Sequence, residues 1–166
     1  MRHTRNISMP NDTRVKTIHH LHVLIQRVGP VEVPWPRYQT EGSAGMDLQA
    51  ALQKPVLLQP GKRVRVPTGI ALALPHGFEG QVRPRSGLAA NHGVTLLNSP
   101  GTIDSDFRGM IEVLLIHLGE TPFSIAPLER IAQLVVTPFF QVEWIPTECL
   151  PSTSRGVGGY GSTGLH

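Results

Sequence analysis

The sequence predicts an all-β fold, a sandwich or jelly-roll-like domain of short strands. Glycine and proline are frequent, with 17 and 15 in 166 residues, which favours short strands joined by turns over long helices. Several segments alternate apolar with polar or small residues, as half-buried strands do. The chain is 40% hydrophobic, shows no internal repeat and does not alternate strands with long helices. One domain with one sizeable core is therefore expected.

The strands follow one another along most of the chain. The first is expected in "LHVLIQRV" from Leu21, and the prolines of "VEVPWP" end it. Residues 63–85 alternate with a period of two, at Val64, Val66, Ile70, Leu72, Leu74 and Val82. "MIEVLLIHLG" and "IAQLVVTPFFQVEWI", which ends at Ile145, predict further buried strands. One short helix is expected in "SGLAANHG", with Ser86 as N-cap and Gly93 as its stop.

The two ends of the chain differ from its middle. Residues 1–18 are polar and predict a flexible extension, residues 19–150 the β domain, and residues 151–166 a glycine-rich segment. That last segment cannot build a core, so it is either a loose terminus or a lid that orders over a ligand. His19, His20 and His22 invite a metal-binding interpretation, but we favour a solvated lead into the first strand, because no partner cluster is nearby.

Charge and cysteine content narrow the possible functions. The net charge is +3 with no long Lys/Arg run, which fits an anionic small molecule at least as well as nucleic acid, and we expect no nucleic-acid partner. The single cysteine excludes an intrachain disulfide and a cysteine-rich zinc site. No apolar run is long enough to span a bilayer, and the first residues lack the apolar centre of a secretory signal. We therefore expect a cytoplasmic protein without membrane contact.

Two stretches have the composition of phosphate-binding turns. "PRSGLA" offers Arg85 as a fork donor, the Ser86 hydroxyl, and Gly87, where a backbone can approach an anion. "RGVGGYGSTG" offers Arg155, a run of glycines, Ser162 and Thr163. Neither stretch is a P-loop, because the glycine spacing differs and no lysine follows.

Carboxylates in two other stretches complete a candidate site. Asp47 lies among small residues in "SAGMDLQA", and "SPGTIDSDFRGM" contains Asp104, Asp106 and Phe107. A carboxylate beside a triphosphate can contact Mg²⁺ or its waters, or take a proton from an attacking water. For Asp106 we favour a turn residue that bonds its own backbone. The roles of Asp47 and Asp104 depend on whether they share one cleft.

Two further side chains in this region have alternative interpretations. Phe107 could pack on a sugar or base, or anchor the core at the foot of a hairpin. Glu112, inside the apolar run "MIEVLLI", is a candidate binding residue, although an outward strand position is favoured.

Five motifs in order resemble those of the trimeric deoxyuridine triphosphate nucleotidohydrolases, the dUTPases. They are "AGMDLQA" from Ala44, "PRSGLA" from Pro84, "GTIDSDFRG" from Gly101, "ERIAQLV" from Glu129 and "RGVGGYGSTG" from Arg155. The resemblance spans nearly the whole chain from Leu21. It implies a jelly-roll-like distorted barrel with at most one short helix, a homotrimer, and active sites at subunit junctions. It also implies that dUTP is hydrolysed to dUMP and pyrophosphate with Mg²⁺, which limits uracil in DNA and supplies dUMP for dTMP synthesis.

The resemblance also assigns a role to each residue. Asp104 would be the general base, Phe107 would stack on the deoxyribose, and Asp47 would contact the Mg²⁺ hydration shell. The uracil pocket would be formed by Asn98, Gly101, Thr102 and Ile103. Phosphates would be held by Arg85, Ser86, Gly87 and Gln133 of a neighbouring subunit. The tail of a third subunit would close the site with Arg155, Gly159, Tyr160, Gly161, Ser162 and Thr163. Phe107 stands where the family usually has Tyr, and Tyr160 where it usually has Phe; both rings keep the ability to stack.

Two other functions fit parts of the same pattern. Deoxycytidine triphosphate deaminases share the fold and some motifs, but they resemble this chain less at "GTIDSDFRG" and at the tail. No acidic residue suited to deamination stands out near Ser86. A non-catalytic nucleotide-binding or regulatory protein could use the same scaffold. The presence of Asp47, Asp104 and Arg155 argues against that alternative.

Overall fold

The computed structural model describes residues 20–159. The expected N-terminal extension, His19 and the candidate residues Tyr160, Gly161, Ser162 and Thr163 lie outside the described residues. Within residues 20–159, no helix is both long and apolar enough to cross a membrane.

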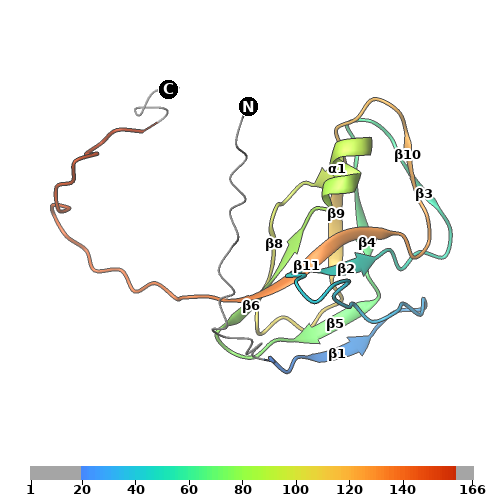
Figure 1. Ribbon diagram of the computed structural model, residues 1–166, viewed down its shortest axis with the longest axis horizontal. Helices are drawn as coiled ribbons and strands as arrows, with labels where there is room; N and C mark the ends of the chain where they lie inside the picture. The colour runs from blue at the N-terminus through green and yellow to red at the C-terminus, as the bar shows by residue number, and fades with distance from the viewer. Residues whose placement is uncertain (1–19, 160–166) are drawn as a thin grey trace, which may run out of the picture.

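The described chain is built mainly of short strands with one short helix, as predicted (Figure 1). The helix is α1 (Ser86–His92). The strands are β1 (Leu24–Arg27), β2 (Met46–Gln49), β3 (Val56–Leu58), β4 (Arg63–Pro67), β5 (Ile70–Ala73), β6 (Phe78–Arg83), β7 (Val94–Leu96), β8 (Gly101–Ile103), β9 (Glu112–His117), β10 (Phe123–Ile125) and β11 (Arg130–Pro138).

Within residues 20–159 all strand pairs are antiparallel, and they form two larger and two smaller sheets. The largest sheet has four strands in the order β2-β11-β6-β8, and the next has the order β4-β9-β7. Pairs β1-β5 and β10-β3 complete the arrangement. The described strands do not close into one continuous barrel.

The core lies between the sheets. It consists of the residues that point inward from the strands, in alternation with residues that point outward. On β9, Val113, Leu115 and His117 are buried, whereas Glu112 is exposed and forms an ion pair with Arg65 at 3.5 Å. This confirms the outward position favoured for Glu112. The four-stranded sheet contributes Leu48, Val82, Ala132 and Leu134 to the same core.

Helix α1 occupies the predicted place, but its N-terminal cap is not Ser86. Arg85 is the N-cap, without a side-chain capping bond, and Ser86 is the first helical residue. Gly93 ends the helix with φ 66°, and its N–H donates to the carbonyl oxygens of Leu88 and Ala89. Only glycine adopts this left-handed conformation without steric cost.

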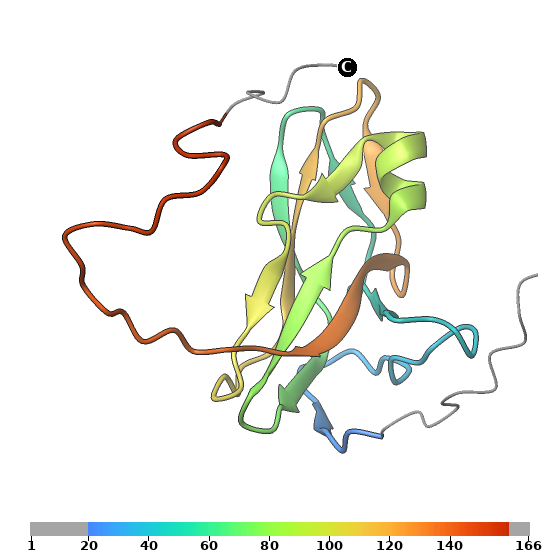
Figure 2. The same ribbon diagram turned by 60° about the vertical axis from the view of Figure 1, so that its left-hand side comes forward.

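The prediction of a buried strand as far as Ile145 is wrong beyond Pro138. Strand β11 ends at Pro138, and Phe140, Trp144 and Ile145 are 94%, 85% and 88% exposed. Figures 1 and 2 show residues 139–159 as an extended arm that leaves the sheets. An alternating sequence forms a strand only where it pairs with another strand, and the arm pairs with no strand of the described residues.

We predict that Gly93→Ala lowers the free energy of unfolding by at least about 1 kcal/mol, the cost of a left-handed alanine. A Cβ at Gly93 would also lie 2.5 Å from the Gly119 nitrogen, which is backbone and cannot swing away. Gly42→Ala is the control, because a Cβ there meets nothing within 4 Å. Urea unfolding at equal protein concentration measures both variants. Equal stability of the two variants would contradict a requirement for glycine at position 93.

Candidate functional site

Asp47 and Gln133 are neighbours across two strands of the four-stranded sheet. Asp47 of β2 is opposite Gln133 of β11, and Gln133 is opposite Arg83 of β6 on its other side. Pro84 and Arg85 follow directly after β6, so the motif "PRSGLA" begins at the end of this row. Three motifs far apart in the sequence therefore meet at one end of β6.

Asp47 binds two arginines through its two carboxylate oxygens. Arg85 Nε donates to Oδ1 at 3.0 Å, and Arg130 Nη1 donates to Oδ2 at 3.1 Å. Arg85 Nη1 also donates to the Arg130 carbonyl oxygen at 3.0 Å. The Asp47 side chain is only 16% exposed, so these bonds are shielded more than ordinary surface ion pairs. The group carries a net positive charge, which suits an anion.

Gln133 and Gly45 hold the neighbouring loop in place. Gln133 Nε2 donates to the Pro84 carbonyl oxygen at 3.0 Å, which ties β11 to the residue before Arg85. A Cβ at Gly45 would overlap the Gln133 amide oxygen, so a larger residue at this position would force the Gln133 amide to move. Ser86 and Gly87 are exposed beside this group. We call Asp47, Arg85, Ser86, Gly87, Arg130 and Gln133 the arginine cluster.

The motif "GTIDSDFRG" lies at the other edge of the same sheet. Gly101 of β8 is opposite Val82 of β6, and Ile103 is opposite Gly80. Asn98 packs on Gly101: a Cβ there would lie 3.2 Å from the Asn98 amide nitrogen. Asp104 follows β8 directly and is exposed. We call Asn98, Gly101, Thr102, Ile103, Asp104 and Phe107 the hairpin cluster.

A tight turn after β8 presents Phe107 to the solvent. The Phe107 N–H donates to the Asp104 carbonyl oxygen at 3.1 Å. Arg108 Nη1 donates to the carbonyl oxygens of Ser105 at 2.7 Å and Phe107 at 2.8 Å. Phe107 is 42% exposed, which excludes the alternative that it anchors the core.

The strand order keeps the two carboxylates of interest apart. Asp47 lies on β2 and Asp104 directly after β8, at opposite edges of the sheet order β2-β11-β6-β8. Three strand spacings separate these edges by about 14 Å. Within one protomer, Asp47 and Asp104 therefore do not share one cleft.

The remaining candidates lie apart from both clusters. Glu112 belongs to the sheet β4-β9-β7, where it pairs with Arg65. Arg155 and Gly159 are exposed on the C-terminal arm, which is separate from β8 and β2 in both views (Figures 1 and 2). Arg155 Nε donates to the Gly158 carbonyl oxygen at 2.9 Å, so this part of the arm forms a local turn.

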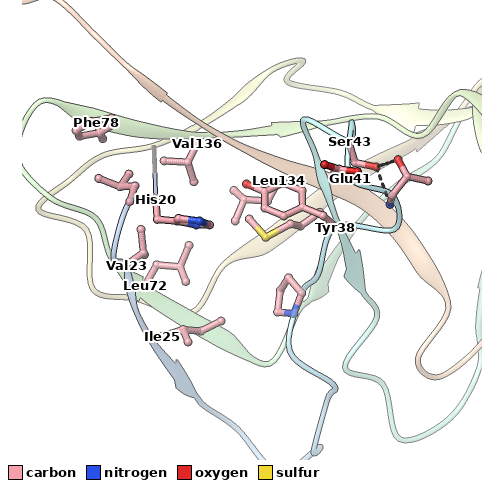
Figure 3. A pocket seen from close by; sticks show the side chains of 14 residues that line it. His20, Val23, Ile25, Tyr38, Glu41, Ser43, Leu72, Phe78, Leu134 and Val136 are labelled. Atoms are coloured by element: carbon pink, nitrogen blue, oxygen red, sulfur yellow. Dashed lines mark hydrogen bonds between the residues drawn. The ribbon is translucent and has the colours of Figure 1, made fainter. Parts of the chain in front are cut away.

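A hollow of about 690 Å³ lies between β1 and the four-stranded sheet, away from the candidate residues. Figure 3 shows Val23, Ile25 and Leu72 on one side of it and Leu134 and Val136 on the other. None of the predicted site residues lines this hollow. His20 does, but residues 20–159 contain no group of three His, Cys, Asp or Glu that could hold a metal ion.

Comparison with known families identifies the chain. A family model described as dUTPase matches residues 31–164, which is most of the sequence. The chain belongs to the dUTPase family.

Solved dUTPase structures have the same jelly-roll fold. The Staphylococcus bacteriophage 80alpha dUTPase with dUpNHpp has 24% identity and a TM-score of 0.75, over 87% of this chain and 99% of that one. A mutant of the 80alpha enzyme has 23% identity and a TM-score of 0.77, over 85% and 98%. A mutant dUTPase from phage phi11 of S. aureus, described with a structural Mg(II) ion, has 18% identity and a TM-score of 0.69, over 77% and 97%.

The sequence of this dUTPase-family chain gave no indication that Arg130 belongs to the candidate site. The residue lies inside the quoted motif "ERIAQLV", at the start of an apolar strand, where a charge looks like an ordinary strand end. Its ion pair with Asp47 joins residues 83 positions apart. Only the pairing of β2 with β11 could reveal this contact.

We predict that Asp47 and Arg85 are coupled by about 1 kcal/mol in a double-mutant cycle of unfolding free energies. The matched control is the pair Arg65 and Glu112, whose side chains are 73% and 37% exposed, against 29% and 16% for Arg85 and Asp47. For that control, less than about 0.5 kcal/mol is expected because water screens it. A control coupling as large as that of Asp47 and Arg85 would contradict a strengthening of the Asp47–Arg85 pair by burial.

Proposed function

We propose that this chain hydrolyses dUTP to dUMP and pyrophosphate at sites shared between the protomers of a homotrimer. The observation that carries the proposal is the separation of the two clusters on one sheet. Asp47 lies on β2, at the opposite edge from β8, which Asp104 follows. Arg85 lies just after the last residue of β6, whereas Ile103, the residue before Asp104, is opposite Gly80 near the start of β6. One bound triphosphate must contact both the residues that bind its phosphates and the general base that activates the attacking water. Since three strand spacings, about 14 Å, separate Asp47 from Asp104 within a protomer, each site would combine clusters from different protomers.

The hairpin cluster would bind the nucleoside. The backbone of Thr102 and Ile103, on edge strand β8, and the exposed amide of Asn98 would offer donors and acceptors to the uracil edge. A wrong base would leave buried polar groups unpaired, at about 1–3 kcal/mol each. A tight hairpin would exclude a 5-methyl group, and the Phe107 ring would exclude a 2′-hydroxyl, both by contact.

Asp104 would activate the attacking water. In the described chain its carboxylate makes no hydrogen bond or ion pair, so its oxygens are free to accept a proton. The water's oxygen would attack the α-phosphorus in line with the departing pyrophosphate, while its proton passes to Asp104. Asp106, two residues after Asp104, would take no part in this step.

The arginine cluster of a neighbouring protomer would bind the phosphates. Arg85, the Ser86 hydroxyl, the backbone at Gly87 and Gln133 would contact phosphate oxygens. Arg130 would share the charge of Asp47 and leave Arg85 partly free for the ligand.

Mg²⁺ would arrive with the triphosphate. Both Asp47 oxygens already accept guanidinium N–H groups, but each has a second lone pair that can bind a water. Asp47 therefore fits contact with the ion's hydration shell and does not fit a direct ligand. When bound, the ion neutralises charge on the phosphate oxygens.

The tail of a third protomer would close the site. Arg155, Gly159, Tyr160, Gly161, Ser162 and Thr163 would supply a cation, a ring and hydroxyls. Closure would exclude bulk water and hold the phosphates in line for the reaction.

The exposed arm supports an oligomer. Three apolar residues of the arm are spaced two residues apart, as in a strand: Phe140, Val142 and Trp144 are 94%, 66% and 85% exposed. Such exposed apolar side chains are typical of a segment that packs against a second chain. The apolar hollow beside β1 would receive such an arm from a second copy. An arm that crosses to another protomer would also carry residues 155–166 to that protomer's site. The expected place of this nucleotide chemistry is the cytoplasm, where it would lower dUTP and supply dUMP.

We predict that Asp104→Asn keeps the affinity for the non-hydrolysable analogue dUpNHpp but lowers kcat for dUTP by at least about 100-fold. An amide has almost the same shape but cannot take the proton. The matched control is Asp106→Asn, which should keep kcat within about threefold. Pyrophosphate release measures kcat and calorimetry measures affinity. Near-normal turnover by the Asp104 variant would remove this residue as the base.

We predict that truncation after Ser154 abolishes most dUTP turnover and leaves the trimer intact, because it removes the closing segment alone. Truncation after Pro138, which also removes Phe140 to Ile145, should dissociate the trimer. Light scattering after gel filtration and pyrophosphate release measure both variants. Full activity after the shorter truncation would contradict the lid, and a trimer after the longer one would contradict the role of the arm.

A further inference from the structure

The ring of Phe107 occupies the space where a side chain at position 109 would begin. A Cβ built at Gly109 would lie 2.6 Å from Phe107 Cζ and 2.9 Å from its Cε2. These distances are too short for real atoms, so no residue with a side chain can occupy position 109 while the ring stays in place.

The backbone gives no other reason for glycine at this position. Gly109 is not among the glycines with positive φ, so its conformation is open to alanine. It is also exposed, and the atoms that a Cβ would meet first all belong to the Phe107 ring. The space that glycine leaves is therefore used by the ring alone.

The turn that carries the ring is fixed, whereas the ring itself can swing. Arg108 Nη1 donates to the carbonyl oxygens of Ser105 and Phe107, and the Phe107 N–H donates to Asp104. The ring is 42% exposed, so solvent is open beside it. A methyl group at position 109 would thus displace the ring to another rotamer and leave the backbone as it is.

We propose that Gly109 is a positioning residue for Phe107 and thereby sets how strongly the site discriminates deoxyribose from ribose. This inference rests on the proposed function, in which the Phe107 ring excludes a 2′-hydroxyl. A Phe107 ring packed on Gly109 is held at a fixed position beside the sugar, where it would exclude a 2′-hydroxyl by steric contact. A displaced ring leaves room at that place and loses part of its contact with the deoxyribose.

The test is Gly109→Ala, with kcat/KM measured for dUTP and for UTP. The ratio of the two values should fall about tenfold or more, as expected when a steric wall is displaced by a methyl group. The melting temperature should stay within about 2 °C of the original, because the clash is relieved by a partly exposed ring. Gly42→Ala is the matched control, since a Cβ there meets nothing within 4 Å, and it should change neither quantity.

A second variant separates positioning from a general structural role. In a Phe107→Ala background there is no ring to displace, so adding Gly109→Ala should change the dUTP to UTP ratio less than twofold. An equal fall with and without the ring would overturn the inference, as would an unchanged ratio in the single variant. Absence of dUTP turnover by the unmodified chain would instead overturn the proposed function and the inference with it.

Discussion

The strand order β2-β11-β6-β8 is the constraint on which the rest of this structure depends. Strand β6 is paired on both sides, so the loop with Arg85 at its end and the hairpin strand β8 at its edge are held at fixed places. Paired strands cannot slide without breaking register and turning side chains to the wrong face. The distance between Asp47 and Asp104 is therefore a property of the fold, and chemistry that needs both must use more than one protomer.

Within each cluster, small residues and charge pairs prepare a rigid surface before any ligand binds. Asp47 keeps two guanidinium groups side by side that would otherwise repel each other, and Gly45 lets Gln133 reach Pro84. In the hairpin cluster, the hydrogen-bonded turn and the absence of a side chain at Gly109 hold the Phe107 ring in place. Such preorganisation lowers the cost of ordering groups when the triphosphate arrives.

The sequence predicted the local features well because local physics determines them. Alternation located β4, β5 and β6, an apolar run located β9, and Gly93 marked the end of α1. Ser86 was misassigned as N-cap because capping depends on dihedral angles one residue away. The strand predicted to Ile145 failed beyond Pro138 because an alternating pattern does not say whether a partner strand is available to pair with it. Arg130 was missed because its partner, Asp47, lies in a distant segment.

Complementation between two inactive variants tests most directly whether the active site is shared. Asp104→Asn damages only the hairpin cluster, and Arg85→Ala damages only the arginine cluster. When equal amounts are refolded together, every mixed trimer regains one intact site, so roughly a quarter of the original dUTP turnover should return. Each variant refolded alone is the control and should stay nearly inactive. Mixtures no more active than these controls would contradict a site assembled between protomers.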